Sequence, residues 1–198
     1  SSNGVYGYVQ RITKISNQDI YAQKYRIIFD WLNKNTLFDS VVYANEEISG
    51  LIPVYTSNNV FYSRYANLFI MADEEIGNRF IINNFFEKFD RDFVIENERT
   101  IWGVRYVDRY GDAIQANKLR KLLGLGLKNE TRLPEKEINK ILATASRIQK
   151  DSFEKRLKKY RADYFVWDKN KNPEWQLNSQ KFLEGIFGNK NFVIYRVL

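Results

Sequence analysis

The chain alternates short apolar runs with longer amphipathic segments, and this alternation constrains its fold most. Five runs rich in β-branched and aromatic residues predict strands, at 40–44, 59–62, 100–107, 163–167 and 192–197. Apolar residues at helical spacing predict helices over 17–35, 67–89, 113–123 and 173–187, a short helix after Asn45 limited by Pro53, and a long helix from 133. Strands separated by helices predict a three-layer α/β fold with a mostly parallel sheet, Rossmann-like but without a nucleotide fingerprint.

The length of 198 residues favours one domain. We expect residues 1–16 to form a flexible or membrane-proximal segment and 17–198 to form a single α/β domain, with a basic helical insertion around 113–160. The apolar patterns at the two ends of this domain predict that both ends contribute to one sheet-and-helix body.

The chain contains no cysteine and no histidine. This excludes thiol nucleophiles, disulfides and every Cys/His metal site, and it removes the commonest general base. The pair Gly124 and Gly126 follows a predicted helix instead of joining a strand to a helix, so it is not a phosphate-binding loop. We therefore expect no cofactor, no bound metal and no catalytic residue.

The positive charge is concentrated in one stretch. The net charge is +7, and residues 114–161 hold 14 Lys/Arg against 5 Asp/Glu. Such a stretch suits nucleic acid or an anionic lipid surface, although a solvated helix face has the same composition. The predicted basic surface consists of Lys150, Lys155, Arg156, Lys158, Lys159 and Arg161.

Polar residues follow the predicted strands, where open parallel sheets bind ligands. The candidate ligand-binding residues are Asn45, Glu46, Glu47, Arg64, Asp108 and Asp168. The alternative is that these residues simply end the strands. Adjacent carboxylates in a turn point apart, so Glu46 and Glu47 are better suited to the start of a helix than to glycoside hydrolysis.

Two segments resemble a known family. Residues 29–36 (FDWLNKNT), 39–44 (DSVVYA) and 48–56 (ISGLIPVYT) are similar to the start of the domain that follows the last transmembrane helix in GT-C-type membrane glycosyltransferases and related multi-pass proteins. Residues 160–168 (YRADYFVWD) and 192–197 (FVIYRV) resemble the end of the same domain. Together the segments cover about a third of the chain, and residues 90–159 match no part of that family.

This resemblance implies a non-catalytic extracytoplasmic domain at the cell membrane, with the chemistry in a transmembrane portion of the same protein. Such a domain would bind a glycan or acceptor, or brace the transmembrane portion, and its basic stretch would face lipid headgroups or an anionic glycan. The alternative function is a soluble nucleic-acid-binding or nuclease-like domain, which the basic stretch favours.

Overall fold

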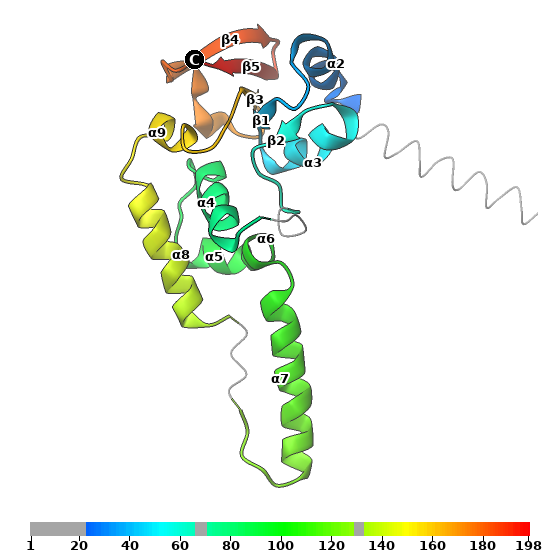
Figure 1. Cartoon of the computed structure of the whole chain (residues 1–198), viewed down its shortest axis with the longest axis vertical. Helices are drawn as coiled ribbons and strands as arrows, with labels where there is room; N and C mark the ends of the chain where they lie inside the picture. Colours follow the sequence, from blue (N-terminus) through cyan, green and yellow to red (C-terminus); the bar gives the residue numbers. More distant parts are fainter. Residues whose placement is uncertain (1–22, 66–70, 129–132) are drawn as a thin grey trace, which may run out of the picture. The chain divides into compact units, whose positions relative to one another are not determined.

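The computed structural model describes residues 23–65, 71–128 and 133–198, which form two compact units (Figure 1). The sheet unit combines the described residues up to Val60 with Ala162–Leu198, and the helical unit spans Phe61–Arg161. The expected segment 1–16 lies outside the described residues. The expected basic insertion at 113–160 lies within the helical unit, and the extent of a single domain over 17–198 stays a prediction.

The sheet unit contains one five-stranded sheet in the order β2-β1-β3-β5-β4. Its strands are β1 (Val41–Tyr43), β2 (Asn59–Val60), β3 (Tyr164–Asp168), β4 (Leu183–Gly188) and β5 (Phe192–Val197). Strand β1 pairs in parallel with β2 and β3, whereas β5 pairs antiparallel with β3 and β4 over longer registers. The α/β class is confirmed, and one sheet joins strands that precede the helical unit in sequence with strands that follow it. The sheet is mixed and mostly antiparallel, however, so the expected mostly parallel, Rossmann-like arrangement is not confirmed.

The sheet differs from the prediction because residues 173–187 do not form a helix. They form two short 3₁₀ turns, Pro173–Trp175 and Leu177–Ser179, followed by β4. Gln176 between the turns has a φ of +42°, a left-handed conformation that ends helical propagation. A tight turn at Asn189, whose Oδ1 accepts hydrogen bonds from the backbone N–H of Asn191 and Phe192, then returns the chain as β5.

Two helices, α2 (Arg26–Asn35) and α3 (Glu46–Tyr55), cover one face of the sheet. Successive side chains of a strand point to opposite faces of the sheet. Val42 therefore packs beneath these helices, whereas the ring of Tyr43 stacks on the ring of Phe165 on the opposite face, with centroids 4.4 Å apart. Helix α3 continues to Tyr55 with Pro53 inside it, two residues beyond the predicted limit. The core beneath the helices contains Tyr25, Ile28, Phe29, Leu32, Val42, Ala44, Ile48, Ile52, Val166, Phe192 and Ile194.

The described part of the helical unit contains α4 (Asp73–Asn83), α5 (Arg91–Glu96), α6 (Glu98–Trp102), α7 (Arg105–Leu122), α8 (Glu135–Ile148) and α9 (Phe153–Leu157). The predicted strand at 100–107 is wrong, because this segment ends α6 and begins α7. Gly103, with a φ of +63°, makes the break between the two helices. Trp102 packs edge-on against Tyr106, with ring centroids 5.7 Å apart.

The predicted long helix from 133 is divided. Helix α8 ends at Ile148, and Ser152 begins α9 by accepting a hydrogen bond at its Oγ from the backbone N–H of Lys155. Helices α4 and α8 approach closely at Gly77, where a Cβ would lie 3.3 Å from Cδ1 of Ile141. A larger residue at position 77 would therefore require the side chain of Ile141 to move.

Candidate functional site

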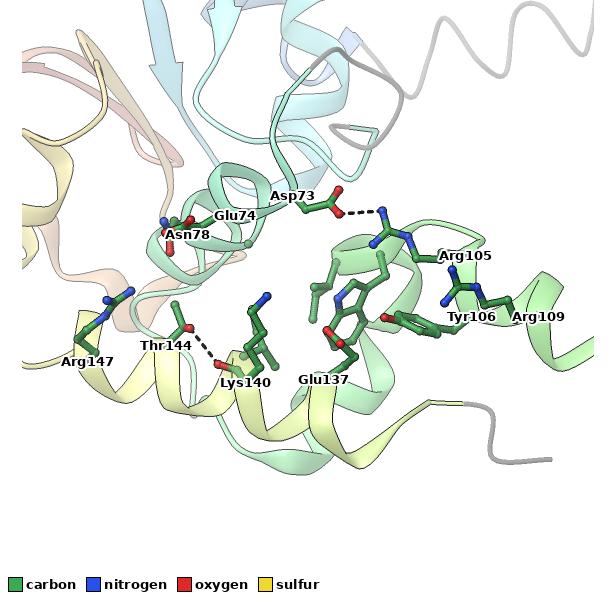
Figure 2. A pocket seen from close by; sticks show the side chains of 14 residues that line it. Asp73, Glu74, Asn78, Arg105, Tyr106, Arg109, Glu137, Lys140, Thr144 and Arg147 are labelled. Carbon is green, nitrogen blue, oxygen red and sulfur yellow. Dashed lines mark hydrogen bonds and ion pairs between the residues drawn. The ribbon is translucent and has the colours of Figure 1, made fainter. Parts of the chain in front are cut away.

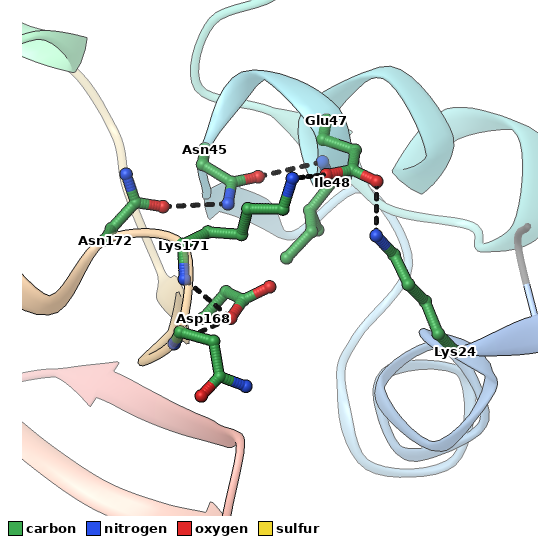
Figure 3. A network of polar contacts seen from close by, with 8 residues as sticks. Lys24, Asn45, Glu47, Ile48, Asp168, Lys171 and Asn172 are labelled. Atoms are coloured by element: carbon green, nitrogen blue, oxygen red, sulfur yellow. Dashed lines mark hydrogen bonds and ion pairs between the residues drawn. The ribbon is translucent and has the colours of Figure 1, made fainter.

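The parallel strands β1 and β3 bring several predicted site residues together at one edge of the sheet (Figure 3). Asn45 follows β1 and begins α3, where its Oδ1 accepts a hydrogen bond from the backbone N–H of Ile48 at 3.0 Å. Its Nδ2 donates to Oδ1 of Asn172, in the turn after β3, at 2.8 Å. The side chain of Asn45 therefore joins the ends of both strands.

The carboxylates at this edge make structural contacts. Glu47 pairs with Lys24 at 2.6 Å and with Lys171 at 3.4 Å. Asp168 is buried, and its Oδ1 accepts hydrogen bonds from the backbone N–H of Asn170 and Lys171 at 3.0 and 3.1 Å. Glu46 lies exposed in the first turn of α3. The polar groups at the strand ends thus begin a helix and close a turn.

Two other predicted ligand-binding residues belong to the helical unit. Arg64 is exposed and donates to the hydroxyl of Tyr65 at 2.9 Å. Asp108 lies on α7 and not at the end of a strand, because the strand predicted at 100–107 is helical. Neither residue belongs to the same unit as Asn45, Glu47 and Asp168.

The predicted basic surface is less uniform than its sequence. Lys155 and Lys158 each form an ion pair at 2.6 Å with the acidic residue four positions earlier, Asp151 and Glu154. Lys150, Lys159 and Arg161 are exposed. These pairs remove part of the positive charge that a nucleic acid would meet.

Arg156 does not belong to this surface, which corrects the prediction. Its side chain is 4% exposed, and its guanidinium lies over the ring of Phe85 at 4.7 Å. Among the described residues, none of its three guanidinium nitrogens has a hydrogen-bond partner. Burial lowers the pKa of Arg156, and the negative charge of Asp151 partly opposes this change.

A second candidate site lies wholly within the helical unit. Residues of α4, α6, α7 and α8 line a pocket of about 550 Å³ (Figure 2). Glu137 and Lys140 extend into it from α8, and Arg105 and Arg109 approach it from α7. The partly buried Trp102 supplies an aromatic surface. The size suits a small ligand of one or two sugar units.

Cations outnumber acids around this pocket. Arg105 pairs with Asp73 at 2.8 Å, and this hydrogen bond raises the pKa of the guanidinium. Within the described ranges, no ion pair engages the other lining cations, which are Arg109, Lys140 and Arg147. Glu74 and Glu137 are the remaining acids of the lining. The pocket therefore favours a ligand that carries negative charge.

Asn78 on α4 is the most informative residue of the lining. It is 2% exposed, and its Oδ1 has no hydrogen-bond partner among the residues that the structure describes. Leaving a buried acceptor unsatisfied costs about 1–3 kcal/mol, so such groups are uncommon in folded proteins. This oxygen has almost no accessible surface, so a ligand hydroxyl or amide N–H in the pocket would reach it only if the amide turned toward the pocket.

No sequence pattern predicted a site role for Asn78, Arg105, Lys140 or Arg147. One signal was available for Asn78, which is an amide between Ile76 and Phe80 in a strongly apolar part of the predicted helix. Lys140 and Arg147 could not be distinguished by sequence from the other cations of residues 114–161, and Arg105 lay in the segment predicted as a strand. Their convergence depends on the packing of α4 and α7 against α8, which no local pattern encodes.

The described part of the chain holds no cluster of three or more acidic side chains suited to a metal ion. Within residues 23–65, 71–128 and 133–198, no helix combines the length and apolar character needed to cross a bilayer. No protein-family profile matches the chain, and no curated protein or solved structure shows significant similarity to it.

Proposed function

We propose that this chain is a non-catalytic extracytoplasmic domain of a membrane glycosyltransferase-like protein, and that the pocket of the helical unit binds an acidic glycan or glycan-bearing acceptor. The observation that carries the ligand assignment is that Arg109, Lys140 and Arg147 line the pocket without an ion pair among the described residues, beside the buried Asn78. The membrane setting rests on the resemblance of the two terminal segments. The partner is then the transmembrane portion of the same protein.

The pocket offers three kinds of contact that an acidic sugar needs. The amide of Asn78, once turned toward the pocket, would accept a hydrogen bond from a hydroxyl group at its Oδ1. Lys140 and Arg147 attract a carboxylate or phosphate, and Arg109 adds charge from the opposite helix. The face of Trp102 packs against the C–H groups of a sugar ring. A neutral apolar ligand would leave both the amide and the cations without partners.

A binding role fits the acidic groups better than a catalytic role. Glu74 is exposed and Glu137 is partly exposed, and both share the pocket with cations. A glycosidase acid needs an apolar pocket that keeps its carboxyl protonated. At the sheet edge, Asp168 and Glu47 are engaged in a turn and in ion pairs. These contacts favour a domain that binds and orients a glycan.

The nucleic-acid alternative receives less support. The ion pairs of Lys155 and Lys158 neutralise part of the predicted basic surface, and the burial of Arg156 removes one cation from it. Nucleic-acid binding needs an exposed basic surface whose cations neutralise phosphates. We therefore propose no nucleic-acid partner.

Calorimetric titration of the chain with a galacturonic acid oligomer tests the ligand assignment. We expect saturable binding, with no binding of a neutral gluco-oligosaccharide of the same length. Replacing either Lys140 or Arg147 by glutamine should weaken binding about tenfold or more, because each charge-assisted hydrogen bond contributes about 1.5–3 kcal/mol. The matched control is Lys136→Gln, an exposed cation on α8 that does not line the pocket.

The two components of the proposal fail separately. Equal binding of the acidic and neutral sugars, or an equal effect of Lys136→Gln, would refute the ligand assignment. The membrane setting is tested by the coding sequence upstream of Ser1, which should encode several apolar segments of about 20 residues. A continuous polar reading frame upstream would refute that setting without changing the pocket.

A further inference from the structure

Five leucines are exposed within nine residues at the end of α7. Their exposed fractions are 62% for Leu119, 83% for Leu122, 66% for Leu123, 50% for Leu125 and 64% for Leu127. Isolated exposed leucines are ordinary on protein surfaces, but a continuous group of this size marks an interaction site. We call residues 117–128 the leucine tip; in Figure 1 it comprises the end of α7 and the loop that follows it.

Backbone and side-chain hydrogen bonds hold the leucine tip in a defined conformation. Gly124 adopts a left-handed conformation with a φ of +68°, and the N–H of Leu125 donates to the carbonyl of Arg120 at 2.8 Å. The buried Asn117 donates to the carbonyl of Lys128 and accepts from its N–H, at 2.7 and 2.9 Å. The leucines are thus presented by an ordered turn.

The charges within residues 113–128 all have one sign, and the next acid in the sequence is Glu130. Residues 113–128 contain Lys118, Arg120, Lys121 and Lys128 and no acidic residue. The nearest preceding acid, Asp112, lies ten residues before Leu122, which corresponds to about 15 Å along the helix. The leucine tip therefore combines an apolar group with four cations and no compensating acid.

We propose that the leucine tip inserts into the headgroup region of an anionic lipid bilayer. Leucines beside lysines and arginines are the combination that interfacial membrane-binding segments use: the apolar side chains enter the acyl boundary while the cations contact lipid phosphates. A second copy of the chain is a poorer occupant, because a symmetric contact would place four cations of each copy against those of the other.

This inference goes beyond the glycan pocket and depends on different residues. The lining of the pocket contains no leucine of the tip. Loss of vesicle binding would therefore leave binding of an acidic sugar unchanged, and loss of sugar binding would leave vesicle binding unchanged. The two proposals are distinguishable in the same protein preparation.

Vesicle flotation of the full chain tests the proposal. We expect binding to vesicles in which about a third of the lipid is phosphatidylglycerol, and at least about tenfold weaker binding to pure phosphatidylcholine. The double substitution Leu122→Ser and Leu123→Ser should weaken binding about 30- to 100-fold, roughly five- to tenfold for each leucine. The matched control, Leu37→Ser with Phe38→Ser, replaces two equally exposed apolar residues of the sheet unit and should bind as the parent does.

A single fluorescent label identifies the segment that enters the lipid. The chain has no cysteine, so Leu123→Cys and Leu37→Cys each accept one environment-sensitive dye. The dye at position 123 should shift to the blue on addition of anionic vesicles, and the dye at position 37 should not. The proposal would be overturned by equal shifts of the two dyes or by a lack of vesicle binding. It would also be overturned if light scattering showed a dimer that the double serine variant abolishes, because that result would assign the leucine tip to self-association.

Discussion

The buried guanidinium of Arg156 leads to a stability prediction that is unusual for a basic residue. Arg156→Met removes a charge that is 4% exposed and whose three nitrogens lack hydrogen-bond partners among the described residues. A buried ion without hydrogen-bond partners costs several kcal/mol, which the charge of Asp151 offsets only in part, whereas the contact with the ring of Phe85 contributes about 1–2 kcal/mol. Methionine keeps the contact with the ring through its thioether. We therefore expect the free energy of unfolding to rise by about 1–3 kcal/mol.

Urea denaturation measures this change. Most of the described helical residues belong to the helical unit, so the circular dichroism at 222 nm mainly follows the unfolding of that unit, whereas the fluorescence of Trp31, Trp167 and Trp175 reports on the sheet unit. In the matched control Lys155→Met, the replaced cation is exposed and pairs with Asp151, and its removal should change stability little. If Arg156→Met lowered the free energy of unfolding by about 1 kcal/mol or more, the guanidinium would have to be stabilised by a contact, and the reasoning would fail.

Three further predictions concern other polar contacts. Asn78→Leu should leave the free energy of unfolding unchanged or raise it by about 1 kcal/mol, while abolishing sugar binding. Asn117→Leu loses two hydrogen bonds to the backbone and should lower the free energy of unfolding by about 2 kcal/mol. Chemical denaturation of both variants measures these changes. Asn45→Ala should cost about 1–2 kcal/mol in the same assay, through the lost start of α3 and the lost bond to the turn after β3. The hydrogen bonds from Arg91 lower the pKa of Glu135 below its usual 4.5. This pair therefore stabilises the fold above about pH 4.5, and the stabilisation is lost as the pH falls through the lowered pKa. Arg91→Gln should therefore reduce the melting temperature at neutral pH but not in strong acid, and an equal reduction at both pH values would contradict the assignment.

The sheet unit could be predicted well wherever local composition and packing agree. The β-branched runs at 40–44 and 163–167 became buried strands, and the helix before the first run placed Ile28 and Leu32 in the core. Where composition and conformation disagreed, the prediction failed. Thr100, Ile101 and Trp102 favour a strand by composition, but the contact of Trp102 with Tyr106 requires helical spacing.

The candidate pocket could not be predicted for a different reason. Its lining comes from four helices, and its residues lie up to 74 positions apart, between Asp73 and Arg147. Sequence spacing reports neighbours within one helix, not the approach of α4 to α8 at Gly77. By contrast, Asn45 and Asp168 were brought together as expected, because the ends of adjacent parallel strands meet at the same edge. Their contacts there are structural ones.

The central claim is that the helical unit holds the ligand site and that the polar edge of the sheet does not. Backbone and side-chain amide NMR signals, followed during titration with the galacturonic acid oligomer, test this claim most directly. We expect saturable shifts at the side-chain amide of Asn78 and along the pocket-facing residues of α8, with Asn45 and Asn172 unchanged. Saturable shifts at Asn45 and Asn172 with none at Asn78, or no saturable shift at either site, would contradict the account.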